Sequence, residues 1–273
     1  MTKLMEKIST LTLATALTIG SAASVGAGEV NTSAEFADYL KRLSAGTQSQ
    51  KNVYAPGVMH ATVAPHGTGF VGLNLFTPRG GNPAAGADGS LSTGVGFGDM
   101  DNGIGASLVL NTTGLVPFGT DGDFTLKIAR TVYQQGANKT TIGAQANRIA
   151  AWGSNATQPK SFDFALTHVG SLPGGNGGTP YIATIGYGTH NGVNGVPGSF
   201  AAFGVGLTEA LGVGVSVKAG AVNAGIGYKV AQVPGMSLSF DLSNINRSGP
   251  AASNAMVVSF GINFSKANLF GRK

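Results

Sequence analysis

The stretch that decides the fold is 222–230, Val-Asn-Ala-Gly-Ile-Gly-Tyr-Lys-Val, followed at 236–243 by Met-Ser-Leu-Ser-Phe-Asp-Leu-Ser. In both, an apolar side chain alternates with a small or polar one, and this period of two is typical of a β-strand with two unlike faces. The same alternation recurs at 203–207, 211–218 and 258–264. The sequence therefore predicts an all-β fold.

The second face of these strands is unusual, because it carries mostly Gly, Ser and Asn where a soluble β-sandwich would carry long polar groups. Charged residues make up only 11% of the chain, against roughly 25% in ordinary domains. Glycine occurs 44 times in 273 residues, which is roughly twice its usual share. A small polar face suits a barrel interior, and the large apolar face then meets lipid. Since strand edges in lipid must be paired, we predict a closed antiparallel transmembrane β-barrel.

Weaker alternation before residue 190 predicts eight further strands. Together with the five clear ones they make thirteen, whereas single-chain bacterial barrels usually have an even number, so we predict 12 or 14 strands. Short connections tend to alternate with longer ones, such as 112–122 and 150–159, and the short set would face the periplasm. The further strands are expected at 57–64, 68–76, 91–98, 104–111, 123–133, 140–149, 160–169 and 180–188.

The residues before the barrel divide into two parts. Residues 1–27 combine Lys3 and Lys7, a short apolar core and small residues, which together indicate a secretory signal peptide. Residues 28–55 form an N-terminal segment in which 33–44 has helical spacing of Phe36, Leu40 and Leu43. This short helix is a candidate plug for the lumen. The barrel is expected over 56–264, with a C-terminal tail at 265–273.

Cleavage of the signal peptide is directly testable. We expect the mature chain to begin near Ser24 or Gly28, because small residues precede both positions. N-terminal sequencing of protein taken from the cell envelope measures this start, and a mature chain that retains Met1 would contradict export.

At its last predicted strand, Met256-Val-Val-Ser-Phe-Gly-Ile-Asn-Phe264, the chain resembles the closing strand of bacterial outer-membrane β-barrel proteins of the porin-like kind. The resemblance implies location in the cell outer membrane, assembly by the outer-membrane assembly machinery, and channel activity as one option. The chain departs from the family pattern because residues 265–273 follow the terminal aromatic.

Other chemistry finds little support in the sequence. Cysteine is absent, and the glycine strings lack the helix of a nucleotide-binding loop. The Asp99–Gly103 stretch lacks the spacing of a calcium loop, and His168 near Ser171 has no orienting acid. We therefore expect no enzyme activity and no cofactor. Scattered Lys and Arg argue against nucleic acid. The expected partners are the lipid bilayer, lipopolysaccharide and, as an open alternative, a second copy in a homo-oligomer.

Two functions remain after these exclusions. The first is a passive diffusion channel for ions or small solutes, in which inward positions such as Gly214 would tolerate a lysine. The alternative is a non-conducting structural, adhesive or partner-docking barrel. The residues expected to line the lumen are Lys127, Asp163, Lys218, Asn223, Lys229, Asp241 and Asn263.

Overall fold

The structure is a computed structural model, and it describes residues 51–77, 88–115, 117–173, 178–191, 196–233, 235–246 and 255–265. The signal peptide and the helix predicted at 33–44 lie outside these residues. The described chain is almost entirely strand, with one short 3-10 helix, η3 (Gly153–Thr157). The strands are β1 (Thr68–Thr77), β2 (Asp88–Gly98), β3 (Gly105–Leu115), β4 (Phe118–Gln135), β5 (Asn138–Asn147), β6 (Ser161–Leu172), β7 (Thr179–Gly188), β8 (Gly198–Gly206), β9 (Leu211–Lys218), β10 (Ala221–Lys229), β11 (Met236–Ser243) and β12 (Ala255–Ser265).

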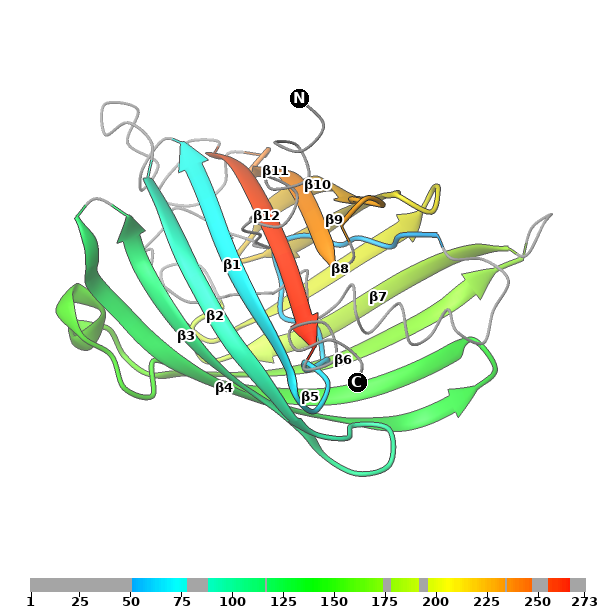
Figure 1. The fold of residues 1–273 in the computed structure, drawn as a ribbon, viewed down its shortest axis with the longest axis horizontal. Coiled ribbons are helices and arrows are strands. Elements are labelled where there is room, and N and C mark those ends of the chain that lie inside the picture. Colours follow the sequence, from blue (N-terminus) through cyan, green and yellow to red (C-terminus); the bar gives the residue numbers. More distant parts are fainter. Residues whose placement is uncertain are drawn as a thin grey trace, which may run out of the picture.

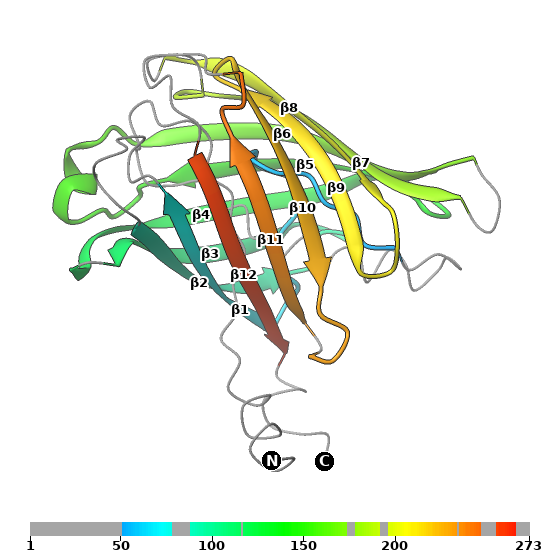
Figure 2. The ribbon, with the colours of Figure 1, turned by 90° about the horizontal axis from the view of Figure 1, so that it is seen from above.

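The strands follow one another around a single sheet. Each pairs antiparallel with the next in sequence, and β1 pairs with β12 from Thr68 opposite Ser265 to Thr77 opposite Met256. This pairing joins the two ends of the sheet into a barrel of twelve described strands (Figures 1 and 2). The prediction of an all-β, antiparallel fold is confirmed.

Two predicted elements were wrong. Residues 57–64 form no strand in the sheet, which explains the odd strand count of the sequence analysis. The loop predicted at 112–122 is also absent, since β3 continues to Leu115 and β4 begins at Phe118. A register shift between Thr113 and Leu115 absorbs the irregularity there. Gly114 and Gly119, on either side of this turn, have positive φ angles, which glycine adopts readily.

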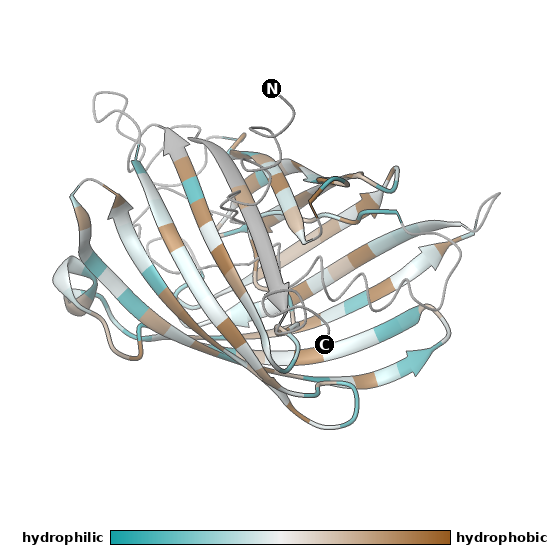
Figure 3. Cartoon of the chain, in the orientation of Figure 1, coloured by the Kyte–Doolittle hydropathy of each residue, from teal (hydrophilic) through white to brown (hydrophobic). Residues whose placement is uncertain are grey.

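The faces of the sheet are arranged as the alternation predicts. On β10, Asn223, Gly225 and Gly227 are buried, while Ile226 is 46% exposed on the outer face. Figure 3 shows the same alternation of apolar and polar bands along the other strands. Large apolar side chains thus cover the outside and polar ones fill the inside, which is the arrangement of a barrel surrounded by lipid. The described residues contain no helix of the length and apolarity needed to cross a membrane.

The outer face generates the first structural test. Ile226→Lys places a charge in the middle of β10, between the outward partners Val213 and Phe240. Because an unpaired charge near the bilayer midplane is poorly solvated, the variant should lose about 2–4 kcal/mol of folding free energy. A urea titration of folding into lipid vesicles measures the loss. Glu209→Lys, in the exposed turn between β8 and β9, is the matched control and should change little.

Candidate functional site

The interior of the barrel holds a segment of the chain itself. Residues 51–66, here called the luminal segment, run inside the sheet ahead of β1 (Figure 1, blue). Almost every side chain between 53 and 64 is buried; Val58 and Ala61 are 0% exposed and Met59 is 1% exposed. The segment has no strand ladder, apart from one bridge between His66 and Gly96.

Both ends of the luminal segment lie at the same mouth of the barrel. The Asn52 amide donates to Thr208 O at 2.8 Å, in the turn that joins β8 to β9. At the other end, the Gly67 amide donates to Gly96 O at 3.0 Å, and β1 begins at Thr68. Even-numbered strands end at the mouth where odd-numbered strands begin, so both contacts belong to one rim. The segment therefore enters the lumen, turns and leaves by the way it came.

Glycines on the inner face make room for this segment. A Cβ at Gly204 or Gly214 would overlap the carbonyl oxygen of Tyr54, and one at Gly96 would overlap that of Ala64. At Gly143 it would lie 2.9 Å from Ala61 Cα. The small face that the sequence presents as open space is thus occupied by the chain's own backbone. The expectation that Gly214 tolerates a lysine was wrong for this reason.

Hydrogen bonds from several strands hold the luminal segment in register. The Tyr54 hydroxyl donates to the Asp241 carboxylate of β11 at 2.6 Å. His60 Nδ1 lies 2.7 Å from Thr184 Oγ1 of β7, and its Nε2 lies 3.1 Å from Ala55 O. Since a carbonyl oxygen can only accept, Nε2 carries a proton. The amides of Ala61 and Ala64 donate to Thr167 Oγ1 and Ser107 Oγ, each at 2.8 Å.

The residues predicted to line the lumen have different surroundings. Lys127, Asp163, Asn223 and Asp241 are each 1–2% exposed, on the inner face of their strands. Asp163 accepts from Asn147 Nδ2 at 2.7 Å and from Asn191 Nδ2 at 2.8 Å, while Asn223 donates to Ser216 Oγ at 3.1 Å. These polar groups are part of packed networks. Half-buried Lys218 and Lys229 lie at opposite ends of the barrel, and Asn263 pairs with Phe70 in the seam between β1 and β12.

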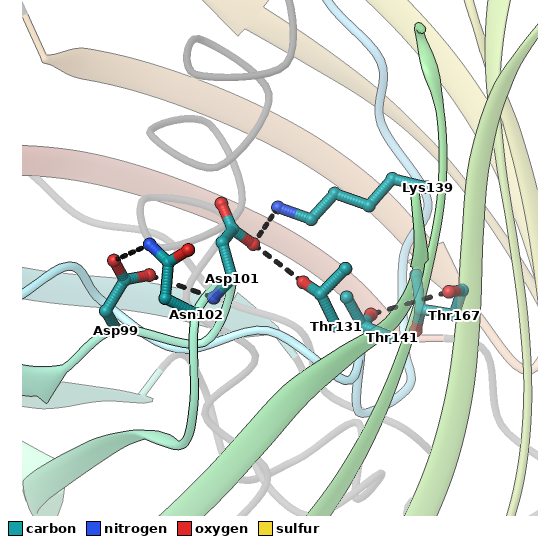
Figure 4. Close-up of polar contacts among 7 residues, drawn as sticks. All are labelled: Asp99, Asp101, Asn102, Thr131, Lys139, Thr141 and Thr167. Atoms are coloured by element: carbon teal, nitrogen blue, oxygen red, sulfur yellow. Dashed lines mark hydrogen bonds and ion pairs between the residues drawn. The ribbon is translucent and has the colours of Figure 1, made fainter. Parts of the chain in front are cut away.

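A tight turn covers the mouth at which the luminal segment enters and leaves. In the turn between β2 and β3, Asp99 accepts from the Asp101 amide at 2.9 Å and from Asn102 Nδ2 at 2.8 Å. Asp101 in turn accepts from Thr131 Oγ1 at 2.6 Å and pairs with the ammonium group of Lys139, which is 2% exposed (Figure 4). The ion pair ties this turn to the β4–β5 hairpin.

The same turn also packs against the luminal segment. Met100 is buried in one apolar cluster with Val63, and its main-chain oxygen accepts from the Thr131 amide at 2.7 Å. The stretch that the sequence analysis compared with a calcium loop is therefore a mouth-covering turn. No group of three or more His, Cys, Asp or Glu able to hold a metal occurs within the described ranges.

The opposite end of the barrel is filled by inward-folded loop residues. Asn155, in η3, is buried and donates to Asp123 Oδ2 at 3.2 Å, and Asp123 also accepts from Asn111 Nδ2 at 2.9 Å. Arg148 donates through Nε to Pro159 O at 2.7 Å. Partial burial lowers the pKa of the loop residue His190, and the nearby Arg148 guanidinium acts in the same direction. Sequence reasoning missed this network because residues distant in the chain build it.

His168, the only histidine near a serine in sequence, lies on the outer side of β6. Its Nδ1 is 2.8 Å from Thr140 Oγ1, and its ring centroid is 5.8 Å from that of Tyr181. The neighbouring Thr167 faces inward, where it contacts the luminal segment. The geometry thus gives His168 a hydroxyl and an aromatic ring as partners on the outer surface.

Several solved structures of barrels are similar to this chain. Omp33 of Acinetobacter baumannii aligns with a TM-score of 0.45 and 11% identity, over 73% of this chain and 98% of that one. Outer membrane phospholipase A of Escherichia coli gives 0.45 and 11%, over 74% and 94%. A mutant of the Rh. blastica porin gives 0.28 and 12%, over 78% and 100%. No protein-family model and no curated sequence matches the chain.

These likenesses concern the fold alone, and they correct one expectation. The sequence analysis predicted that the chain is not an enzyme, but a phospholipase is among the similar barrels, so the prediction was wrong in excluding catalysis. The surfaces show the kind of surroundings that the barrel suits: large apolar side chains cover the outside of the paired sheet, and polar residues fill its inside. The chain is a closed antiparallel β-barrel whose apolar outer face is typical of barrels that span a membrane.

Proposed function

We propose that this chain is a closed twelve-stranded barrel that has no standing pore, because its own luminal segment plugs it. The observation that carries the proposal is the burial of residues 53–64 inside the sheet, with the Tyr54 hydroxyl bound to Asp241. The plug was expected in the helix at 33–44, and we now assign it to the segment that follows.

The solvent exposure of the inner wall favours a plugged barrel over an open diffusion channel. Ser92, Ser107 and Thr167 are all 0% exposed, although they lie on the inner faces of three different strands. In a water-filled lumen such hydroxyl groups would be wet, as in porins. Here Ser92 donates to Asn111 Oδ1 at 3.1 Å, whereas Ser107 and Thr167 accept backbone amides of the luminal segment. Of the two functions that the sequence left open, this geometry supports the non-conducting barrel.

A gated channel is the second candidate, and a specific observation favours it. The luminal segment is bound mainly by single side-chain contacts, so its withdrawal would leave every strand pair of the sheet intact. Because it enters and leaves at one mouth, it can withdraw as a loop. The passage would then be lined by the residues expected from the sequence: Lys127, Asp163, Lys218, Asn223, Lys229, Asp241 and Asn263.

The setting of the barrel in the envelope completes the proposal. The lipid bilayer surrounds the apolar outer face. We further propose a signal peptide at 1–27, insertion by the outer-membrane assembly machinery, and lipopolysaccharide around the end that carries the long loops 148–160 and 189–197. Association with a second copy of the chain is compatible with the exposed outer face.

Planar-bilayer recording tests the plug. The full chain should give no steady conductance steps, whereas a variant with residues 53–64 replaced by a Gly/Ser linker of equal length should give them, because the lumen loses its filling. Gly103→Ala, at a turn position where a Cβ meets only Asp99 O at 3.7 Å, is the control and should stay silent. Steps of equal size from the full chain and the linker variant would contradict the proposal.

Thiol labelling tests separately whether the luminal segment packs against Gly204. The method is feasible because the chain has no cysteine. In a Val58→Cys background, Gly204→Ala should raise the rate of labelling by a water-soluble maleimide roughly tenfold or more. The added methyl collides with Tyr54 O, and such overpacking costs about 1–3 kcal/mol. Gly103→Ala in the same background should leave the rate unchanged. Equal labelling rates in Val58→Cys and in its two glycine variants would show that Gly204 does not hold the luminal segment in place.

A further inference from the structure

The outer surface carries a broad apolar groove that the plugged lumen does not explain. It crosses the strands from β4 to β9, is open to the outside, and has a volume of about 950 Å³. Its outward-facing lining is made by Ile104, Ile128, Arg130, Ile142, Ala144, Phe164, Leu166, Ile185, Tyr187, Ser199, Ala201 and Val217. One of these residues, Arg130, is charged.

Strand register shows how the groove forms. One row of paired residues runs from Arg130 through Ile142, Leu166, Ile185 and Ala201 to Val217. The adjacent row contains Ala144 and Ser199, each next to a large side chain. Small residues within these rows lower the surface between the larger ones. Six strands at about 4.8 Å spacing make the row on the order of 24 Å long, which is comparable to an extended acyl chain.

Arg130 lies at the rim end of this groove. Its neighbour Ala129 pairs with Gly105, the first residue of β3, so Arg130 is close to the turn that covers the plugged mouth. The outward residues on either side of it in β4, Ile128 and Val132, are apolar and exposed. Within the described part of the chain no carboxylate pairs with Arg130. A lone guanidinium beside lipid is costly unless an anion or water reaches it.

We propose that this groove binds a phospholipid, with one acyl chain along the row from Ile142 to Val217 and an anionic phosphate headgroup at Arg130. The guanidinium binds phosphate oxygens through two parallel N–H donors, which an ammonium cannot reproduce. Acyl chains compete with bulk lipid on packing alone, so the groove fixes the chain by shape and Arg130 selects the headgroup. The apolar lining and the single cation together match a lipid rather than a soluble ligand.

Lipid retention measures this binding directly. The full chain is reconstituted with equal amounts of phosphatidylglycerol and phosphatidylcholine, extracted in mild detergent and examined by native mass spectrometry. The wild-type chain should retain one phosphatidylglycerol in preference to phosphatidylcholine. Arg130→Gln should reduce that preference on the order of tenfold, because the guanidinium favours the net negative headgroup of phosphatidylglycerol over phosphatidylcholine, whose choline cation it repels. Arg130→Lys should fall between the two.

A second pair of variants tests the groove independently of the charge. Ala201→Trp fills the row and should abolish retention of both lipids, whereas Ala224→Trp, on the outer face of β10 and outside this groove, should retain phosphatidylglycerol as the wild type does. Heat-dependent mobility on gels verifies that each variant folds. Equal retention by wild type, Arg130→Gln and Ala201→Trp would overturn the proposal. A lipid-free dimer of the wild-type chain would do so too, since a second copy would then cover the groove.

Discussion

The rest of this structure depends on the pairing of β1 with β12. In a bilayer the backbone amides and carbonyls of an edge strand have no water to bond with, and each unpaired group would cost several kcal/mol. The seam from Thr68 opposite Ser265 to Thr77 opposite Met256 removes both edges at once. Once the sheet is closed, alternation sends every second side chain to lipid and the others into a confined space.

That confined space sets a second requirement, which the luminal segment satisfies. Inward polar groups without water need protein partners, because a buried hydroxyl or carboxylate left alone is destabilising. Asp241 finds the Tyr54 hydroxyl, Thr184 finds His60, and Thr167 and Ser107 accept backbone amides of the segment. Glycines at 204, 212 and 214 bring the wall close enough for these bonds to form. The luminal segment and the glycines of the inner face therefore depend on each other: the glycines leave the space, and the segment fills it.

The sequence predicts the wall of the barrel well and its contents poorly. Alternation at 211–218, 222–230 and 236–243 coincides with β9, β10 and β11 almost residue for residue, because the period of two follows from strand geometry alone. Residues 57–64 have a similar mixture of small and apolar residues, but they pack against the wall on several sides and join no ladder. Nothing in their local pattern distinguishes a buried strand from a buried extended segment. The sequence also placed Asp163 and Asp241 on the inner face, but not the partners that bury them.

The luminal segment enters and leaves the barrel at the same mouth. The molecule therefore has two units that differ in local stability, the sheet and the segment inside it. The sheet is held by continuous ladders that must break together, whereas the segment is held by isolated hydrogen bonds and apolar packing, with no ladder of its own. Local opening in proteins proceeds by such units, the weakest first. The backbone amides of residues 53–64 should then exchange with deuterium long before those of the strands. The interior of this barrel would be a module that can melt and reform while the wall around it stays folded.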